Sequence, residues 1–178
     1  MLFRSYSSRR SQGLDCTILE AARATSAAPS FFNSVSIGPL GEKFIDGAIG
    51  CNNPVREVMA EAYDIWPSEL HRNLVMVSVG TGQPTVRPIG ENLVEFARTA
   101  VKFATETEHT ASGFARDHPE LQSTKKRYFR FSVAKGLENV GLEEYKKLAT
   151  VSSVTADYLG LEEVRRTLQD CARVLRAV

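Results

Sequence analysis

The sequence predicts an α/β fold in which a mainly parallel central sheet is flanked by helices. Helical patterns alternate along the chain with short apolar strands, which is typical of α/β proteins rather than of all-α or all-β proteins. One strand, at residues 74–79, is nearly all apolar, as expected of a strand covered on both faces in a parallel sheet. The length of 178 residues is enough for one domain with a hydrophobic core.

The composition is that of an ordinary folded protein, with 43% hydrophobic and 24% charged residues. Lys and Arg (22) nearly balance Asp and Glu (21), so no overall charge attracts nucleic acid or an anionic membrane. No stretch approaches the roughly 20 apolar residues of a membrane span. The N-terminus is charged where a signal peptide would be apolar. We therefore expect a cytoplasmic protein whose contacts with membranes are peripheral, and no nucleic-acid partner.

The cysteines predict neither a metal site nor a disulfide framework. Cys16, Cys51 and Cys171 are an odd number and lie far apart, and no pair shows the spacing of metal ligands. Because free cysteines are usually found in protein cores, we expect three buried thiols.

The chain is expected to divide into three parts. Residues 1–14 show little apolar periodicity, which predicts an irregular segment, a loop or a frayed end. Residues 15–135 hold the strands and helices of the main domain, and residues 136–178 hold the terminal helices. Asp15 predicts the N-cap of the first helix, and Pro29 is expected to end that helix.

A hairpin and a second helix are expected next. Residues 31–37 and 42–45 are predicted to be extended segments, joined by a Gly-Pro-Leu-Gly turn at residues 38–41. Asn53 predicts the start of a helix, because its side chain can accept from the first backbone N–H groups. The proline that follows it has no N–H to lose at the first helical position.

Predicted helices and strands also alternate in the second half of the chain. Residues 91–110 carry an apolar stripe at helical spacing. Residues 128–133 alternate large apolar residues with polar ones, which predicts a strand with one exposed face near a sheet edge. Two terminal helices are expected at residues 142–159 and 161–177, separated by Gly160.

Asp46 is the strongest candidate for a chemical role. It stands at the end of a predicted strand, where the sites of α/β proteins gather, and Gly47 can make a tight turn beside it. Asp-Gly is also a common turn dipeptide, so a structural role, in which Asp46 bonds its own backbone, stays open. Ala48 follows Gly47 and completes an Asp-Gly-Ala sequence. Asn52 and Asn53 are expected to cap the next helix and so to position the loop that follows Asp46.

Three segments resemble, in order and spacing, the second half of a patatin-like phospholipase domain. They are an Ala-rich helix with its Pro-Ser-Phe-Phe continuation at 20–32, the Phe-Ile-Asp-Gly-Ala segment at 44–55 and the Val-Ser-Val-Gly-Thr-Gly strand at 77–82. The Tyr-Phe-Arg-Phe segment at 128–131 is similar to a late strand of that family. The resemblance is greatest to fungal members and extends over roughly residues 2–133.

This resemblance implies part of a three-layer α/β sandwich and a lipid acyl hydrolase that needs no cofactor or metal. The family uses a Ser–Asp dyad, with Ser in a G-x-S-x-G turn and Asp in an Asp-Gly-Ala or Asp-Gly-Gly motif, which Asp46 matches. The implied substrate is a carboxylic ester of a phospholipid or neutral glycerolipid at a lipid or membrane surface. In such a reaction the carboxylate takes the serine proton, and the serine attacks the ester carbonyl.

The sequence departs from the family's pattern at the nucleophile. No G-x-S-x-G occurs in the 178 residues, and no Gly-rich run suited to an oxyanion hole precedes Asp15. We therefore expect this chain to supply the Asp base, to lack the N-terminal half of the hydrolase domain and to be inactive alone. The alternative is a non-catalytic remnant, or a regulatory or binding module of the same fold. A sheet without its first strands would expose an apolar face, so we expect the isolated chain to aggregate or to be molten.

Other candidates for chemistry are weaker. Ser26, Ser30 and Ser78 lack the flanking glycines of a nucleophile turn, and the three histidines share no spacing that suggests a catalytic triad. The Gly-Thr-Gly at 80–82 lacks the remaining residues of a phosphate-binding loop, so a tight turn after a strand is expected there. The basic residues 125–127 are expected to be a solvated strand entry, with contact to phospholipid head groups as the alternative.

Overall fold

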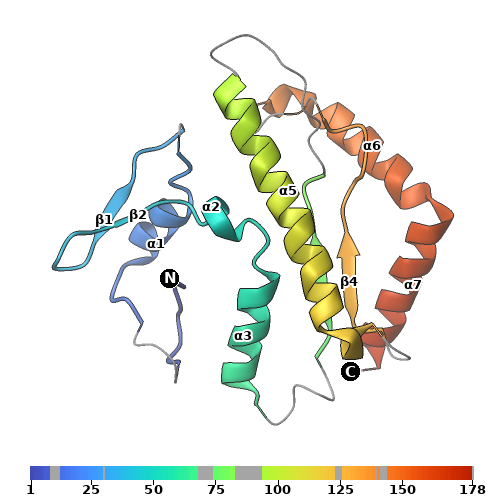
Figure 1. The fold of residues 1–178 in the computed structure, drawn as a ribbon, viewed down its shortest axis with the longest axis horizontal. Coiled ribbons are helices and arrows are strands. Elements are labelled where there is room, and N and C mark those ends of the chain that lie inside the picture. The colour runs from blue at the N-terminus through green and yellow to red at the C-terminus, as the bar shows by residue number, and fades with distance from the viewer. Residues whose placement is uncertain are drawn as a thin grey trace. The chain divides into compact units, whose positions relative to one another are not determined.

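The computed structural model describes residues 1–8, 13–29, 31–67, 74–82, 94–122, 126–138, 140 and 144–177. The chain forms two compact units, Met1–Ser68 and Glu69–Val178, and each is described here by itself. Helices and short strands follow one another in both units (Figure 1). The predicted α/β class is therefore confirmed.

The first unit begins with helix α1 (Ile18–Thr25). Its N-cap is Thr17, whose hydroxyl accepts from the Glu20 N–H at 3.2 Å. The Glu20 carboxylate accepts in return from the Thr17 N–H at 2.8 Å, which completes a capping box. The prediction that Asp15 caps this helix is wrong, because it is Thr17 that stands three residues before a glutamate able to return the bond.

Strands β1 (Val35–Ile37) and β2 (Glu42–Phe44) form the predicted antiparallel hairpin. In its turn the Gly41 N–H donates to the Gly38 carbonyl at 3.1 Å, and both glycines have positive φ angles, 65° and 80°. Ile37 is almost fully buried in the core of this unit. The strands are shorter than predicted, but the turn lies where it is expected.

Helix α3 (Val55–Ile65) follows, as predicted. Its buried side chains recur at helical spacing and form one face: Val55, Met59 and Ala62. Asn53 is buried, and its side-chain oxygen accepts from the Val55 N–H at 3.3 Å. The N-cap of α3 is nevertheless Pro54, without a side-chain capping bond, so the predicted start at Asn53 is one residue too early.

The second unit contains a parallel strand pair, β3 (Met76–Val79) and β4 (Tyr128–Phe131). Helix α5 (Val94–Asp117) contributes Phe114, which is fully buried and lies with its ring 5.0 Å from that of Tyr128. The terminal helices are α6 (Leu148–Gly160) and α7 (Glu162–Arg176), and α7 packs against β4 (Figure 1). Short 3-10 helices η1 (Pro119–Leu121) and η2 (Tyr145–Lys147) precede β4 and α6. The predicted break between the two terminal helices, at Gly160, is confirmed.

The predicted burial of the two strands is wrong. Strand β3 is expected to be covered on both faces, yet Val77 is 46% and Val79 is 78% exposed. Among the described residues, β3 pairs only with β4. Some of the apolar side chains of β3 therefore stay exposed. Strand β4 is expected to have an exposed face, yet Tyr128 and Phe129 are both buried, because helices α5 and α7 contact this strand.

Cys16, Cys51 and Cys171, all among the described residues, form no disulfide. Cys171 is buried on α7, as predicted, whereas Cys16 and Cys51 are half-buried. In the part of the chain that the structure describes, no helix combines the length and the apolar run that a membrane crossing requires.

Candidate active site around Asp46

Asp46 lies two residues after strand β2, in the loop that leads to α3 through the short turn α2 (Ala48–Cys51). Its N–H donates to the carbonyl of Ala27, a fully buried residue, at 3.0 Å. Its carbonyl accepts from the Ile49 N–H at 3.4 Å. The backbone of Asp46 is therefore held both by the residues after α1 and by its own loop.

The Asp46 carboxylate is held through one of its two oxygens. The Ala48 N–H donates to Oδ1 at 2.8 Å, so Asp46 makes the turn contact that its Asp-Gly sequence allows. The other oxygen, Oδ2, has no hydrogen-bond partner among the described residues, and the side chain is half-buried. A carboxylate in this state has a fixed orientation and keeps an oxygen available to accept a proton.

The tight turn of this loop is at Gly50 and not at Gly47. Gly47 has φ −64° and ψ −9°, a conformation open to any residue, and a Cβ there would meet no atom within 4 Å. Gly50 has a φ of 91°, which favours glycine. Gly50 is followed by Cys51, the exposed Asn52 and the buried Asn53, and no pattern in the sequence indicates its positive φ.

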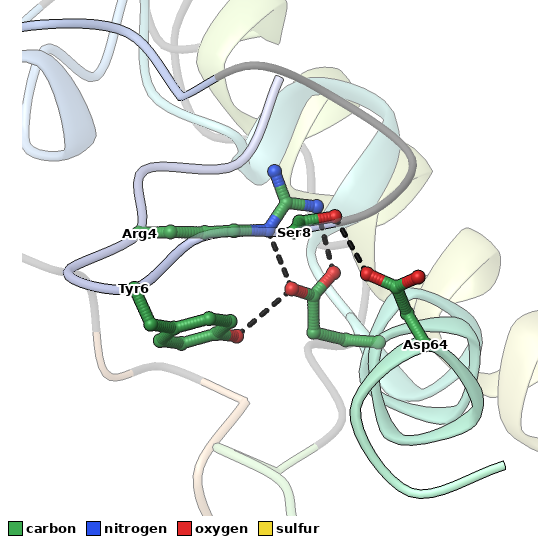
Figure 2. A network of polar contacts seen from close by, with 5 residues as sticks. Arg4, Tyr6, Ser8 and Asp64 are labelled. Carbon is green, nitrogen blue, oxygen red and sulfur yellow. Dashed lines mark hydrogen bonds and ion pairs between the residues drawn. The ribbon is translucent and has the colours of Figure 1, made fainter.

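The N-terminal residues 3–8 lie against helix α3 (Figure 2). The Arg4 guanidinium donates to both oxygens of Glu61, at 2.5 and 2.7 Å, and the Tyr6 hydroxyl donates to Glu61 Oε1 at 2.9 Å. The Ser8 hydroxyl donates to Asp64 at 2.6 Å. The backbone here is irregular, as predicted, but the expectation of a frayed end is wrong, because three side chains anchor the segment.

The same segment also contacts the strand that precedes Asp46. The ring of Phe3 lies 5.5 Å from that of Phe44, the last residue of β2. The side chains of Arg4 and Glu61 are only 10% and 16% exposed, so solvent screens their ion pair less than a surface pair. The hydrogen bond to Glu61 raises the pKa of Arg4 and also that of Tyr6, so both stay protonated at neutral pH.

The serines and the Gly-Thr-Gly turn, which are weaker candidates for chemistry, either make ordinary structural contacts or lie outside the described residues. The Ser26 hydroxyl donates to the Arg23 carbonyl at 3.3 Å, and Ser78 accepts from Arg130 at 2.9 Å. A Cβ on Gly80 would lie 2.5 Å from the Ser132 hydroxyl, so the Gly-Thr-Gly turn is closely packed at its first residue. Ser30 lies outside the described residues.

The histidines and the basic residues before β4 also make ordinary contacts where they are described. His118 pairs with Glu120 at 3.0 Å and lies against the ring of Phe114, and His109 is exposed. Lys126 lies over the ring of Phe129 at 5.5 Å. His71 and Lys125 lie outside the described residues. Among the residues that are described, no three His, Cys, Asp or Glu side chains gather as a metal site would require.

A polar cluster in the second unit was not foreseen from the sequence. Arg130 on β4 donates to Ser78 on β3, at 2.9 Å, and to Glu108 on α5, at 2.6 Å. Burial raises the pKa of the neighbouring Tyr128. Because Glu108 and Arg130 are 22 residues apart on different elements, no local pattern predicts their pairing.

The first unit is similar to one known family of proteins. A family model of patatin-like phospholipases matches residues 3–59. A protein of Arabidopsis thaliana named Phospholipase A I is 29% identical over 115 residues, which cover 65% of this chain and 8% of that protein. No solved structure matches the chain significantly. The matched segment, which contains Asp46, is similar to patatin-like phospholipases.

The matched residues 3–59 make up most of the first unit. They include the segment 3–8, the β1–β2 hairpin, the Asp46 loop and the beginning of α3. The chain spans only a small part of the length of the plant relative. The expected similarity to fungal members stays a prediction, as do the expected boundaries at residues 14 and 135.

Proposed function

We propose that the protein that carries this chain hydrolyses carboxylic esters of lipids, with Asp46 as the general base of a Ser–Asp dyad. The observation that carries this proposal is the state of the Asp46 carboxylate within the family-matched segment. The Ala48 N–H fixes Oδ1, while Oδ2 has no partner among the described residues. An oriented carboxylate with one available oxygen suits a base that takes a proton from a serine hydroxyl.

The proposed reaction has two steps. Asp46 accepts the proton of the serine hydroxyl, the serine oxygen bonds to the ester carbonyl carbon, and the alcohol leaves with the proton to give an acyl-serine. Water then attacks the acyl-serine, gives its proton to Asp46 and releases the fatty acid, after which the serine regains its proton. The serine and the donors for the oxyanion come from a G-x-S-x-G turn and a Gly-rich turn outside these 178 residues.

The residues beside Asp46 support a lipid substrate. Ile45 is 49% exposed and Ile49 is 48% exposed, and they flank the aspartate on either side. Apolar side chains at a half-buried carboxylate suit an acyl chain better than a polar substrate. We place the reaction at a lipid or membrane surface in the cytoplasm, with a phospholipid or a neutral glycerolipid as substrate.

Two measurements test this proposal. The first is the sequence of the native transcript upstream of the Met1 codon, where we expect an in-frame Gly-rich turn and a G-x-S-x-G. The second is ester hydrolysis by the purified 178-residue chain, for which we expect no turnover that depends on Asp46. If the 178-residue chain hydrolyses esters and Asp46→Asn abolishes that activity, the nucleophile lies within this chain. That result would overturn our assignment of the nucleophile to another segment. A native start at Met1 would overturn the dyad and favour the non-catalytic module.

A further inference from the structure

We propose that residues 3–8 form a brace that sets the position of the Asp46 carboxylate, with Arg4 and Glu61 as positioning residues. This inference rests on the proposed function, because the position of the Asp46 carboxylate matters for catalysis only if Asp46 is the general base. The term brace here means the segment from Phe3 to Ser8 with its contacts to β2 and α3.

The position of Asp46 depends on strand β2 and helix α3, which its loop connects. The loop leaves β2 at Phe44 and reaches α3 at Val55. The hydrogen bond from Ala48 to Asp46 fixes a local turn, and the bond from the Asp46 N–H to the Ala27 carbonyl holds the backbone against the segment after α1. Neither bond fixes the distance between Asp46 and α3. A displacement of α3 relative to β2 therefore moves the carboxylate.

One short segment contacts both of these elements. Phe3 packs against Phe44, directly before the loop, at a ring distance of 5.5 Å. Arg4 and Tyr6 bind Glu61 on α3, directly after the loop (Figure 2). Because Phe3 and Arg4 are neighbours in the chain, a single peptide unit connects the end of β2 with the middle of α3, at Glu61.

The contacts of the brace with α3 restrain the rotation of the helix as well as its position. Arg4 forms a two-pronged ion pair with Glu61, and such pairs fix geometry better than single contacts. Ser8 binds Asp64, which lies three residues after Glu61 and so on the same helix face. Two anchor points about one turn apart prevent the helix from turning about its axis.

Hydrogen exchange of the native protein that carries this chain, followed by mass spectrometry, tests the brace. The variants are Arg4→Glu, Glu61→Arg and the double exchange of the two charges. We expect each single variant to speed exchange of the loop 45–54 about tenfold, because a charged hydrogen bond is lost. The double variant is expected to restore slow exchange, since the ion pair forms again with its charges reversed.

A matched control is Arg166→Glu, which breaks the ion pair of Arg166 with Glu162 on α7. That pair has a similar length, 3.0 Å, but both side chains are more than 70% exposed. We expect this variant to leave exchange of the loop 45–54 unchanged. In the brace variants, amides of α7 are expected to keep their exchange rates, which separates local loosening from general loss of stability.

Three results would overturn the brace. The single variants could leave exchange in the loop 45–54 unchanged, they could speed exchange equally in both units, or the loop could exchange at the unfolded rate in the unsubstituted chain. None of these measurements involves ester turnover. Failure of the brace is therefore distinct from failure of the proposed dyad, which the activity of Asp46→Asn reports.

Discussion

The Arg4 guanidinium and the Glu61 carboxylate, 57 residues apart in the chain, meet in a two-pronged ion pair at the side of helix α3. Together with the Phe3–Phe44 contact, this pair connects strand β2, which precedes the Asp46 loop, with helix α3, which follows it. A segment that is irregular in its backbone thus belongs to the framework of the candidate active site.

Acidification is expected to weaken helix α1. The Thr17 N–H and hydroxyl donate to the Glu20 carboxylate and lower its pKa below the ordinary value of 4.5. A carboxylate with a lowered folded pKa stabilises the fold above pH 4.5 and loses this contribution as the pH falls through its folded pKa. Urea unfolding measured at a series of pH values checks this. Glu20→Gln is expected to show a smaller loss of stability on acidification, and an equal loss would contradict the role of the capping box.

Gly80→Ala is expected to destabilise the second unit by about 1–3 kcal/mol, since it overpacks a closed site. The new Cβ would lie 2.5 Å from the hydroxyl oxygen of Ser132 and 2.8 Å from its Cβ. Adding Ser132→Gly removes both atoms, so the double variant is expected to recover part of the lost stability. Thermal unfolding of the three proteins measures this. A single variant as stable as the parent would show that the turn has room for a side chain.

The three thiols are expected to differ in their rate of alkylation. Burial raises the pKa of the Cys171 thiol, so less of the reactive thiolate is present at neutral pH, and the group is also shielded. Cys16 and Cys51 are half-buried and are expected to react faster. Mass spectrometry of the chain after brief treatment with iodoacetamide distinguishes them. Labelling of Cys171 at the rate of the other two would contradict its burial.

Strand β3 is expected to promote self-association. Val79 is 78% exposed at an apolar strand that pairs with one other strand among the described residues. Val79→Lys is therefore expected to reduce the aggregate fraction in analytical ultracentrifugation. Val58→Lys is the matched control, because Val58 is also an exposed valine, at 51%, but lies on a helix. An equal effect of both variants would mean that added charge alone keeps the chain dispersed.

Local signals in the sequence predicted much of the fold. The Gly-Pro-Leu-Gly sequence predicted the turn between two extended segments, the Asn-Asn-Pro sequence predicted the start of α3 to within one residue, and Gly160 predicted the break between the terminal helices. Each of these features depends on neighbouring residues alone, through turn geometry or hydrogen bonds to nearby N–H groups. For the same reason the N-cap of α1 was misplaced by only two residues.

The features that the sequence did not predict depend on contacts between distant residues. The exposure of Val77 on β3 depends on which strands and helices cover this strand, and its apolar composition does not report that. The pairing of Arg4 with Glu61 requires the folded position of α3, and no spacing pattern contains it. At the candidate site, the sequence did not predict the tight turn at Gly50, because positive φ cannot be assigned among several loop glycines, and the role of Asp46 stays a prediction.

The most direct test of the account is fatty-acid release from phospholipid vesicles by the native protein that carries this chain, compared with its Asp46→Asn variant. Asparagine has nearly the same shape and its oxygen can still accept from the Ala48 N–H, so the turn is kept while the base is lost. We predict that Asp46→Asn lowers the rate about 10²- to 10⁴-fold, the usual contribution of a general base. The control Asp15→Asn, at an exposed carboxylate, is predicted to keep full activity. Undiminished release by Asp46→Asn, or no release by the unsubstituted protein, would contradict the account.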